Sequence, residues 1–206
     1  MSDIAIFTET SAYSLAGVAG MGLTAYLGSK MCLPANARWQ DRFTFIWLAF
    51  DALIHFTFEG SFLWLSVFGR QVNTSTGMFA ALWREYAAAD FRWGVSDPTV
   101  VSLEILTVLG AGPLCCYILK QLTNNDPARH YWIIVLSTAE LYGGWMTFCP
   151  EWLTGSPNLN TSNPLYLWVY LVLMNVIWVF IPFWLMYDSY SHIAGALRAT
   201  TKSKRA

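Results

Sequence analysis

The chain has 206 residues, of which 55% are hydrophobic and only 12% are charged, and its formal net charge is −1. A typical soluble domain carries about 25% charged residues, and a nucleic-acid-binding domain shows a basic patch or stripe that is absent from this sequence. The composition therefore excludes a disordered or collagen-like chain, argues against a nucleic-acid partner, and indicates an all-α polytopic membrane protein.

Five apolar stretches are long enough to cross a bilayer, which takes roughly 20 mostly apolar residues. These predicted spans run over residues 11–27, 43–68, 99–119, 131–152 and 164–187. The first is rich in Gly and Ala, which allows close contact between helices. Between the second and third spans, residues 78–93 predict a short helix that lies at the membrane interface or folds over the mouth of the bundle. We expect one five-helix transmembrane domain over residues 1–206.

Lysine and arginine are distributed unevenly between the two predicted sides of the membrane. Nine of the twelve fall in the first and third inter-span segments and in the tail 188–206, and three fall on the opposite side. The positive-inside rule makes the first side cytosolic, so the N-terminus is luminal and the tail is cytosolic. The tail ends in Lys202-Ser203-Lys204-Arg205-Ala206, which resembles a dilysine retrieval signal and favours the endoplasmic-reticulum membrane.

The predicted spans carry ionisable side chains at membrane depth. Asp51, His55 and Glu59 follow one another at intervals of four residues, which places them on one face of a helix. Glu104 lies in the third span and Glu140 in the fourth. Each such group costs at least about 2.5 kcal/mol on insertion scales, and neutral amides would join helices at a lower desolvation cost. The pattern therefore favours a function in which a proton moves or a cation is held.

Acid/base chemistry on an apolar substrate fits these groups best. A neutral carboxylic acid beside a carboxylate or an imidazole is an acid/base pair. His55 and Glu59 can share a proton, and Glu104 can supply the second proton-transfer group. Aromatic faces around them stabilise a positive centre. The residues predict a substrate that is protonated on an alkene carbon, passes through a carbocation and loses a proton elsewhere.

Other chemistries are poorly supported by the sequence. The HxxxE spacing of His55 and Glu59 is not a zinc motif, and the four cysteines form no CxxC pair, so we expect no metal. The chain lacks GxSxG and GxGxxG motifs, and we expect no cofactor. His130 and His192 lie at span ends and are expected at the surface. A proton-coupled transporter remains an alternative from the residues alone.

Short sequence runs identify a family resemblance that covers nearly the whole chain, most clearly residues 43–187. The runs are Ile54 to Gly60, Leu82-Trp83-Arg84-Glu85-Tyr86, Asp97 to Thr107, Glu140-Leu141-Tyr142-Gly143 and Met174-Asn175 to Trp178. With these runs the chain resembles the emopamil-binding protein (EXPERA) superfamily, which includes sterol Δ8–Δ7 isomerase, and within it the emopamil-binding-protein-like branch.

The resemblance implies roles for individual residues. The proton-transfer residues of the sterol isomerases match His55, Glu59 and Glu104. Family positions in and around the cavity match Tyr86, Arg92, Thr107, Asn175 and Trp178. The chain departs from the isomerases at Asp51, where they have no Asp, and at Glu140, where they have Gln; both acids match the emopamil-binding-protein-like branch. The resemblance also implies a cavity open to the bilayer and a homodimer.

Together these observations predict a cofactor-independent isomerase or cyclase that acts on a lipophilic sterol, terpenoid or similar natural product within the membrane lipid. The predicted catalytic residues are His55, Glu59 and Glu104. The predicted substrate-binding residues are Asp51, Tyr86, Arg92, Thr107, Glu140, Tyr142, Asn175 and Trp178. The alternatives are a non-catalytic binder of sterols or amines and a structural partner of another membrane enzyme.

Overall fold

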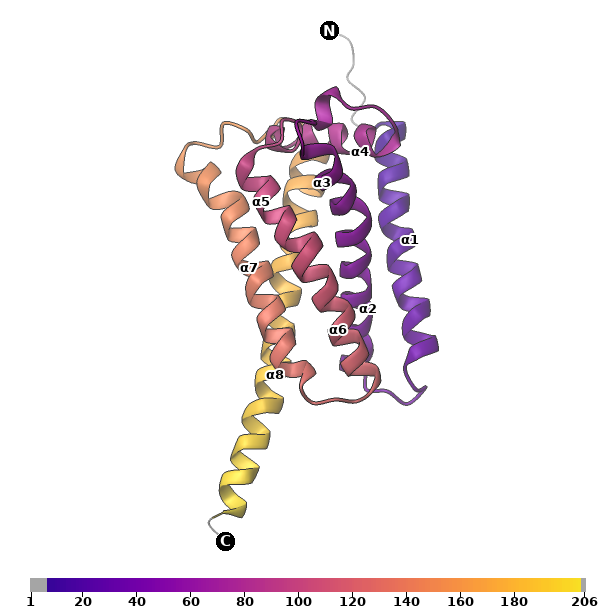
Figure 1. The fold of residues 1–206 in the computed structure, drawn as a ribbon, viewed down its shortest axis with the longest axis vertical. Coiled ribbons are helices and arrows are strands. Elements are labelled where there is room, and N and C mark those ends of the chain that lie inside the picture. The colour runs from indigo at the N-terminus through magenta and orange to yellow at the C-terminus, as the bar shows by residue number, and fades with distance from the viewer. Residues whose placement is uncertain (1–6, 205–206) are drawn as a thin grey trace.

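The computed structural model describes residues 7–204, and within that range the chain is all-helical (Figure 1). No strand forms in this part of the chain, where an isolated bridge pairs Asp90 with Leu159. The α-helices are α1 (Glu9–Cys32), α2 (Trp39–Ile54), α3 (Gly60–Ser66), α4 (Met78–Ala87), α5 (Pro98–Leu106), α6 (Gly112–Thr123), α7 (Arg129–Leu153) and α8 (Met174–Ser203). The predicted all-α class is confirmed.

Three π-helical segments continue these α-helices without a break. The segment η1 (His55–Glu59) joins α2 to α3, η4 (Thr107–Ala111) joins α5 to α6, and η5 (Tyr166–Leu173) leads into α8. π-Helical turns inside α-helices are rare and occur frequently at functional sites. Here η1 contains the predicted catalytic pair His55 and Glu59, η4 begins at the predicted site residue Thr107, and η5 ends two residues before Asn175.

Three continuous helices are long and apolar enough to cross a membrane: Trp39–Ser66, Pro98–Thr123 and Tyr166–Ser203. They correspond to the second, third and fifth predicted spans. Helices α1 and α7 have 24 and 25 residues, enough to cross at a rise of about 1.5 Å per residue. They do not meet the same standard of hydropathy, because α1 is rich in Gly, Ser and Thr and α7 contains charged residues. The count of five spans therefore stays a prediction.

The C-terminal tail differs from the expectation that the last helix ends near residue 187. Helix α8 continues to Ser203, because the sequence after Tyr187 contains no proline and only a single glycine to stop it. Figure 1 shows this extension projecting beyond the rest of the bundle. Arg205 and Ala206, the end of the predicted retrieval signal, lie outside the described residues.

The long helices run side by side, and α4 lies across the end of the bundle at which α1 begins (Figure 1). The predicted short helix within residues 78–93 is thus present as α4 and the 3₁₀ turn η3 (Phe91–Trp93). Two buried clusters fix the architecture. One joins α2, α6, α7 and α8 around Leu48, Ile118 and Leu136. The other stacks the Trp83 ring of α4 on the Trp93 ring of η3, with the ring centroids 5.0 Å apart.

Candidate functional site

A cavity of about 570 Å³ opens among α2, η1, α4, α5, η4, α7, η5 and α8, and its wall is mostly apolar. This volume lies within the range of about 300–1,000 Å³ found for small-molecule sites. Nine of the eleven predicted site residues line the cavity: His55, Glu59, Tyr86, Glu104, Thr107, Glu140, Tyr142, Asn175 and Trp178. Asp51 and Arg92 are not among the lining residues.

His55 lies between two carboxyl groups of its own helix. Its Nδ1 is 2.5 Å from Oε2 of Glu59, and its Nε2 is 3.3 Å from Oδ1 of Asp51. The imidazole is almost fully buried. The spacing of four residues that predicts a shared helix face therefore brings all three side chains into one connected group.

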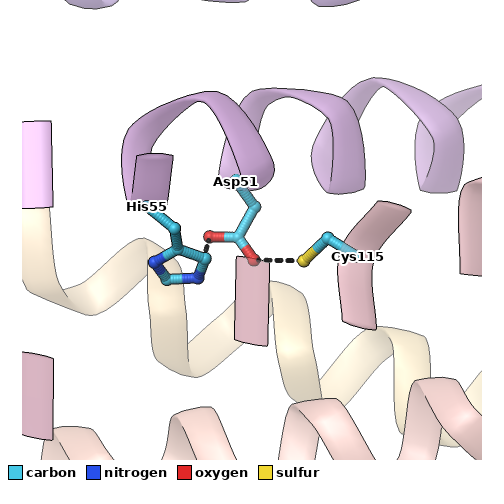
Figure 2. Close-up of side chains that lie close together, drawn as sticks. All are labelled: Asp51, His55 and Cys115. Atoms are coloured by element: carbon cyan, nitrogen blue, oxygen red, sulfur yellow. Dashed lines mark hydrogen bonds and ion pairs between the residues drawn. The ribbon is translucent and has the colours of Figure 1, made fainter. Parts of the chain in front are cut away.

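Asp51 is fully buried behind this imidazole rather than in the cavity wall. Its Oδ1 accepts a hydrogen bond from Nε1 of Trp178 at 2.8 Å, and its Oδ2 accepts one from the Cys115 thiol at 3.3 Å. Figure 2 shows the carboxyl group standing between His55 and Cys115. In this position Asp51 does not face the cavity as predicted, and its carboxyl group instead accepts hydrogen bonds from Trp178 of the cavity wall and from Cys115 of α6.

Glu104 reaches the cavity from α5. It is buried, and the Thr107 hydroxyl donates to its Oε2 at 3.1 Å. Its carboxyl group lies beside that of Glu59. Gly112, at the start of α6, lets this helix pack closely against η1, because a Cβ atom at that position would lie only 3.0 Å from the Phe56 ring and 3.3 Å from the Cβ of His55.

Asn175 and Tyr86 form a second polar part of the wall. The Asn175 side-chain amide donates to the backbone carbonyl groups of Tyr170 and Leu171, at 2.9 and 3.1 Å, and to the Tyr86 hydroxyl at 3.3 Å. Burial raises the pKa of Tyr86 above its usual range, so the phenol keeps its proton at neutral pH. Because Asn175 donates to its oxygen, the phenol can give its own hydrogen bond to a guest in the cavity.

Arg92 belongs to a buried clamp outside the cavity. Its Nε and Nη2 donate to the two carboxyl oxygens of Asp90, at 2.9 and 2.6 Å, and its Nη1 donates to the Thr147 carbonyl at 2.8 Å. Glu151 lies 3.7 Å from the same side chain. The prediction that Arg92 binds substrate is not supported by this geometry, which gives it the role of tying η3 to α7.

Sequence reasoning missed two residues of the site region, Cys115 and Glu85. Cys115 stands in an apolar run, and no signal marked its thiol as a partner of Asp51. Glu85 lines the cavity and accepts hydrogen bonds from Thr8 at 2.9 Å, from Tyr170 at 3.1 Å and from Ser11. A carboxylate directly before Tyr86 in the short helix was the available signal. Glu85 fastens α4 to α1 and to η5.

Two clusters bring three ligand-type side chains together, Asp51–His55–Cys115 and His130–Asp188–His192. In the first, the Asp51 carboxyl group occupies the space between imidazole and thiol and contacts each with a different oxygen. In the second, the imidazole rings of His130 and His192 are stacked 4.3 Å apart at 11°, so their in-plane lone pairs do not converge.

The expected surface position of the two histidines near the tail is wrong for one of them. His130 is buried, because its ring stacks on His192 and lies 3.3 Å from the Ser189 hydroxyl. His192 is partly exposed and contacts Arg38 at 3.0 Å. The stack joins α7 to α8 at the end of the bundle away from the cavity.

Replacing Gly143 by Leu is expected to fill part of the cavity without unfolding the protein. Gly143 lines the cavity, and a Cβ atom added there meets nothing within 4 Å. A helical Gly also costs about 1 kcal/mol relative to Ala, so the variant should keep or raise its thermal unfolding temperature. Binding of a bulky apolar ligand should weaken at least tenfold, measured by displacement titration, with Gly195→Leu as the control outside the cavity. Unchanged binding would show that this wall does not receive the ligand.

Comparison with known proteins places these residues in a family context. A family model described as EBP: EXPERA (EXPanded EBP superfamily) matches residues 78–189, more than half of the chain. The 3-beta-hydroxysteroid-Delta(8),Delta(7)-isomerase of Cavia porcellus is 29% identical over 173 residues, which are 84% of this chain and 74% of that protein. The isomerase of the same name from Rattus norvegicus is 31% identical over 155 residues, 75% of this chain and 66% of that protein.

The similarity extends to synthases. An isomeliandiol synthase of Melia azedarach is 28% identical over 143 residues, which are 69% of this chain and 65% of that protein. The chain thus spans about two thirds to three quarters of the length of these three relatives.

Proposed function

Because the chain belongs to the EXPERA superfamily, we propose that it is a cofactor-independent membrane isomerase or cyclase that acts on a sterol, a terpenoid or a similar lipophilic substrate. The family contains sterol isomerases and a synthase of isomeliandiol. The observation that carries the proposal is the connected set of His55, Glu59 and Glu104 on the wall of one apolar cavity.

The geometry provides for both proton transfers of an isomerisation. One carboxyl group of the set gives its proton to an alkene carbon, so that a C–H bond forms from the π electrons and a carbocation remains. The imidazole–carboxylate pair His55–Glu59 or Glu104 then removes a proton from another carbon, and the electrons of that C–H bond form the new double bond. No electrons are gained or lost, and no co-reactant is consumed. General acid/base catalysis of this kind contributes about 10²- to 10⁴-fold to a rate.

The cavity also contains the means to stabilise the cation. Trp178 lies in the wall, where its Nε1 is held by Asp51 and its ring is 5.2 Å from that of Trp47. Fixed in this way, its ring can present a π face to a positive centre, an attraction that grows when water is excluded. Tyr86 and Asn175 supply hydrogen-bonding groups that orient the polar end of the substrate.

The number and the orientation of the membrane spans belong to the same proposal. We propose a single EXPERA-type domain over residues 1–206 with five spans in the endoplasmic-reticulum membrane, the N-terminus luminal and the C-terminus cytosolic. The excess of Lys and Arg on one side supports the orientation, and α1 begins at the end of the bundle opposite to that at which α8 ends (Figure 1). A homodimer is part of the same proposal. The assignment to the emopamil-binding-protein-like branch stays a prediction.

A non-catalytic binder of sterols or amphiphilic amines is the second candidate. It is favoured by the three carboxyl groups of Glu59, Glu104 and Glu140 in a wall rich in aromatic rings, an arrangement that holds a cationic ligand as readily as it stabilises a transient cation. Deuterium uptake separates the two functions, since a binder leaves the carbon skeleton of its ligand unlabelled.

Replacing His55 by Ala is expected to reduce turnover by about 10²-fold or more, because it removes the group that joins two carboxyl groups. Purified protein would be incubated in D₂O with 8(9)-unsaturated 3β-hydroxysterols and with tetracyclic terpenoids, and deuterium in the product would be measured by mass spectrometry. The exposed Glu9→Gln change serves as the control. Full activity of His55→Ala would contradict the mechanism, and the absence of label with every substrate would favour the binder.

A further inference from the structure

The carboxyl group of Glu140 receives no hydrogen bond from the described residues. Both oxygens are buried, and within residues 7–204 no N–H, hydroxyl or thiol donates to either of them. The side chain lines the cavity from α7. A buried acceptor without a donor costs about 1–3 kcal/mol, and more if it is charged, so this position carries a cost that an amide or an alkyl side chain would avoid.

The polar group beside Glu140 is a second acceptor, the carboxyl group of Asp51. Trp178 Nε1 donates to Oδ1 of Asp51 and the Cys115 thiol donates to its Oδ2, while Nε2 of His55 stands 3.3 Å from Oδ1 without a formed hydrogen bond. Two buried carboxyl groups side by side repel each other when both are ionised, and a proton held between them removes that repulsion and gives the unpaired Glu140 a hydrogen bond.

We propose that Asp51 and Glu140 hold one shared proton, and that His55 connects this carboxyl pair to the second pair, Glu59 and Glu104. The catalytic part of the inference rests on the proposed function; the shared proton does not. The two pairs form one chain of titratable groups across the site, with Glu140 at one end and Glu104 at the other, and both ends line the cavity. Glu140 is thus a further residue of the reaction, and Asp51 is a positioning residue that acts through it.

The chain lets the site reset without bulk water. After an isomerisation the acid has lost a proton and the base has gained one. The proton returns when Glu59 gives a proton to Nδ1 of His55, Nε2 of the same ring gives its proton to Asp51, and Asp51 passes one to Glu140; the reverse order serves the opposite assignment of acid and base. Each step breaks one O–H or N–H bond and forms another, and no charge is created overall.

Infrared spectroscopy tests the shared proton without a substrate. We expect purified wild-type protein at neutral pH to show the carbonyl stretch of a protonated carboxylic acid, shifted in D₂O, and we expect Glu140→Gln to remove this part of the band. Asp51→Asn should shift the band, since the partner of the proton changes, and Glu140→Asp should keep it at an altered position. The exposed Glu9→Gln change should leave the spectrum unaltered. A Glu140→Gln difference spectrum without an acid band would overturn the inference.

Turnover tests the connection between the pairs. With the substrate that gives product in the His55 experiment, Glu140→Gln is expected to lower kcat about 10- to 100-fold and to leave KM within a factor of about three, with partial recovery in Glu140→Asp. An unchanged kcat together with loss of the acid band would show a shared proton that takes no part in the reaction, and would overturn this part of the proposal. If wild-type protein turns over none of the substrates, the proposed function fails, while the infrared result stands on its own.

Discussion

Replacing Glu104 by Gln is expected to cause one of the largest losses of activity that a single change in this chain can produce, a fall in kcat of about 10²- to 10⁴-fold. Glu104 brings a carboxyl group to the cavity from α5, beside Glu59 and within 3.1 Å of the Thr107 hydroxyl. The amide keeps the shape and the hydrogen bond from Thr107 but can neither give nor take the proton. The rate of product formation and the uptake of deuterium from D₂O measure the effect.

Measurements of stability and of ligand binding separate the loss of the proton-transfer group from damage to the fold. Glu104→Gln should unfold at the wild-type temperature or above it, because it removes an ionisable group from a buried position, and it should still bind an amphiphilic ligand in the same cavity. Thr107→Val, which deletes only the neighbouring hydroxyl, should cost no more than about tenfold. Wild-type turnover in Glu104→Gln would refute its place in the mechanism, whatever the result for His55.

Much of the fold follows from patterns that are local in the sequence. Apolar runs of sufficient length place all the long helices, and the mixed composition of residues 78–93 places α4 and η3 across the bundle mouth. The spacing of Asp51, His55 and Glu59 predicts one connected group on the second span, and the three side chains are in contact as expected.

The positions that the sequence pattern did not predict depend on contacts between segments far apart in the sequence. Whether Asp51 faces the cavity or the interior is decided by Trp178 and Cys115, which come from two other helices. The burial of His130 depends on a ring in α8. The π-helical segments have no sequence signature that we could use, although two of them contain the site residues His55, Glu59 and Thr107.

Arg92, which the family resemblance places near the cavity mouth, lies in a buried clamp between η3 and α7. Its side chain is 4% exposed, and its bidentate pairing with Asp90 is completed by the Thr147 carbonyl. Arg92→Met is therefore expected to destabilise the protein by about 3–5 kcal/mol, since it leaves the Asp90 carboxylate buried without its partner. A clear fall in the thermal unfolding temperature in detergent measures this effect.

A matched substitution at the other end of the molecule separates a buried ion pair from an exposed one. Arg38 also pairs with a carboxylate, Asp41 at 3.1 Å, but its side chain is 46% exposed, so Arg38→Met should cost no more than about 1 kcal/mol. If Arg92 only ties η3 to α7, the folded fraction of Arg92→Met at low temperature should bind ligand as tightly as wild type. Loss of binding without loss of stability would instead return Arg92 to the substrate site, because a residue that contacts the ligand affects affinity whether or not it supports the fold.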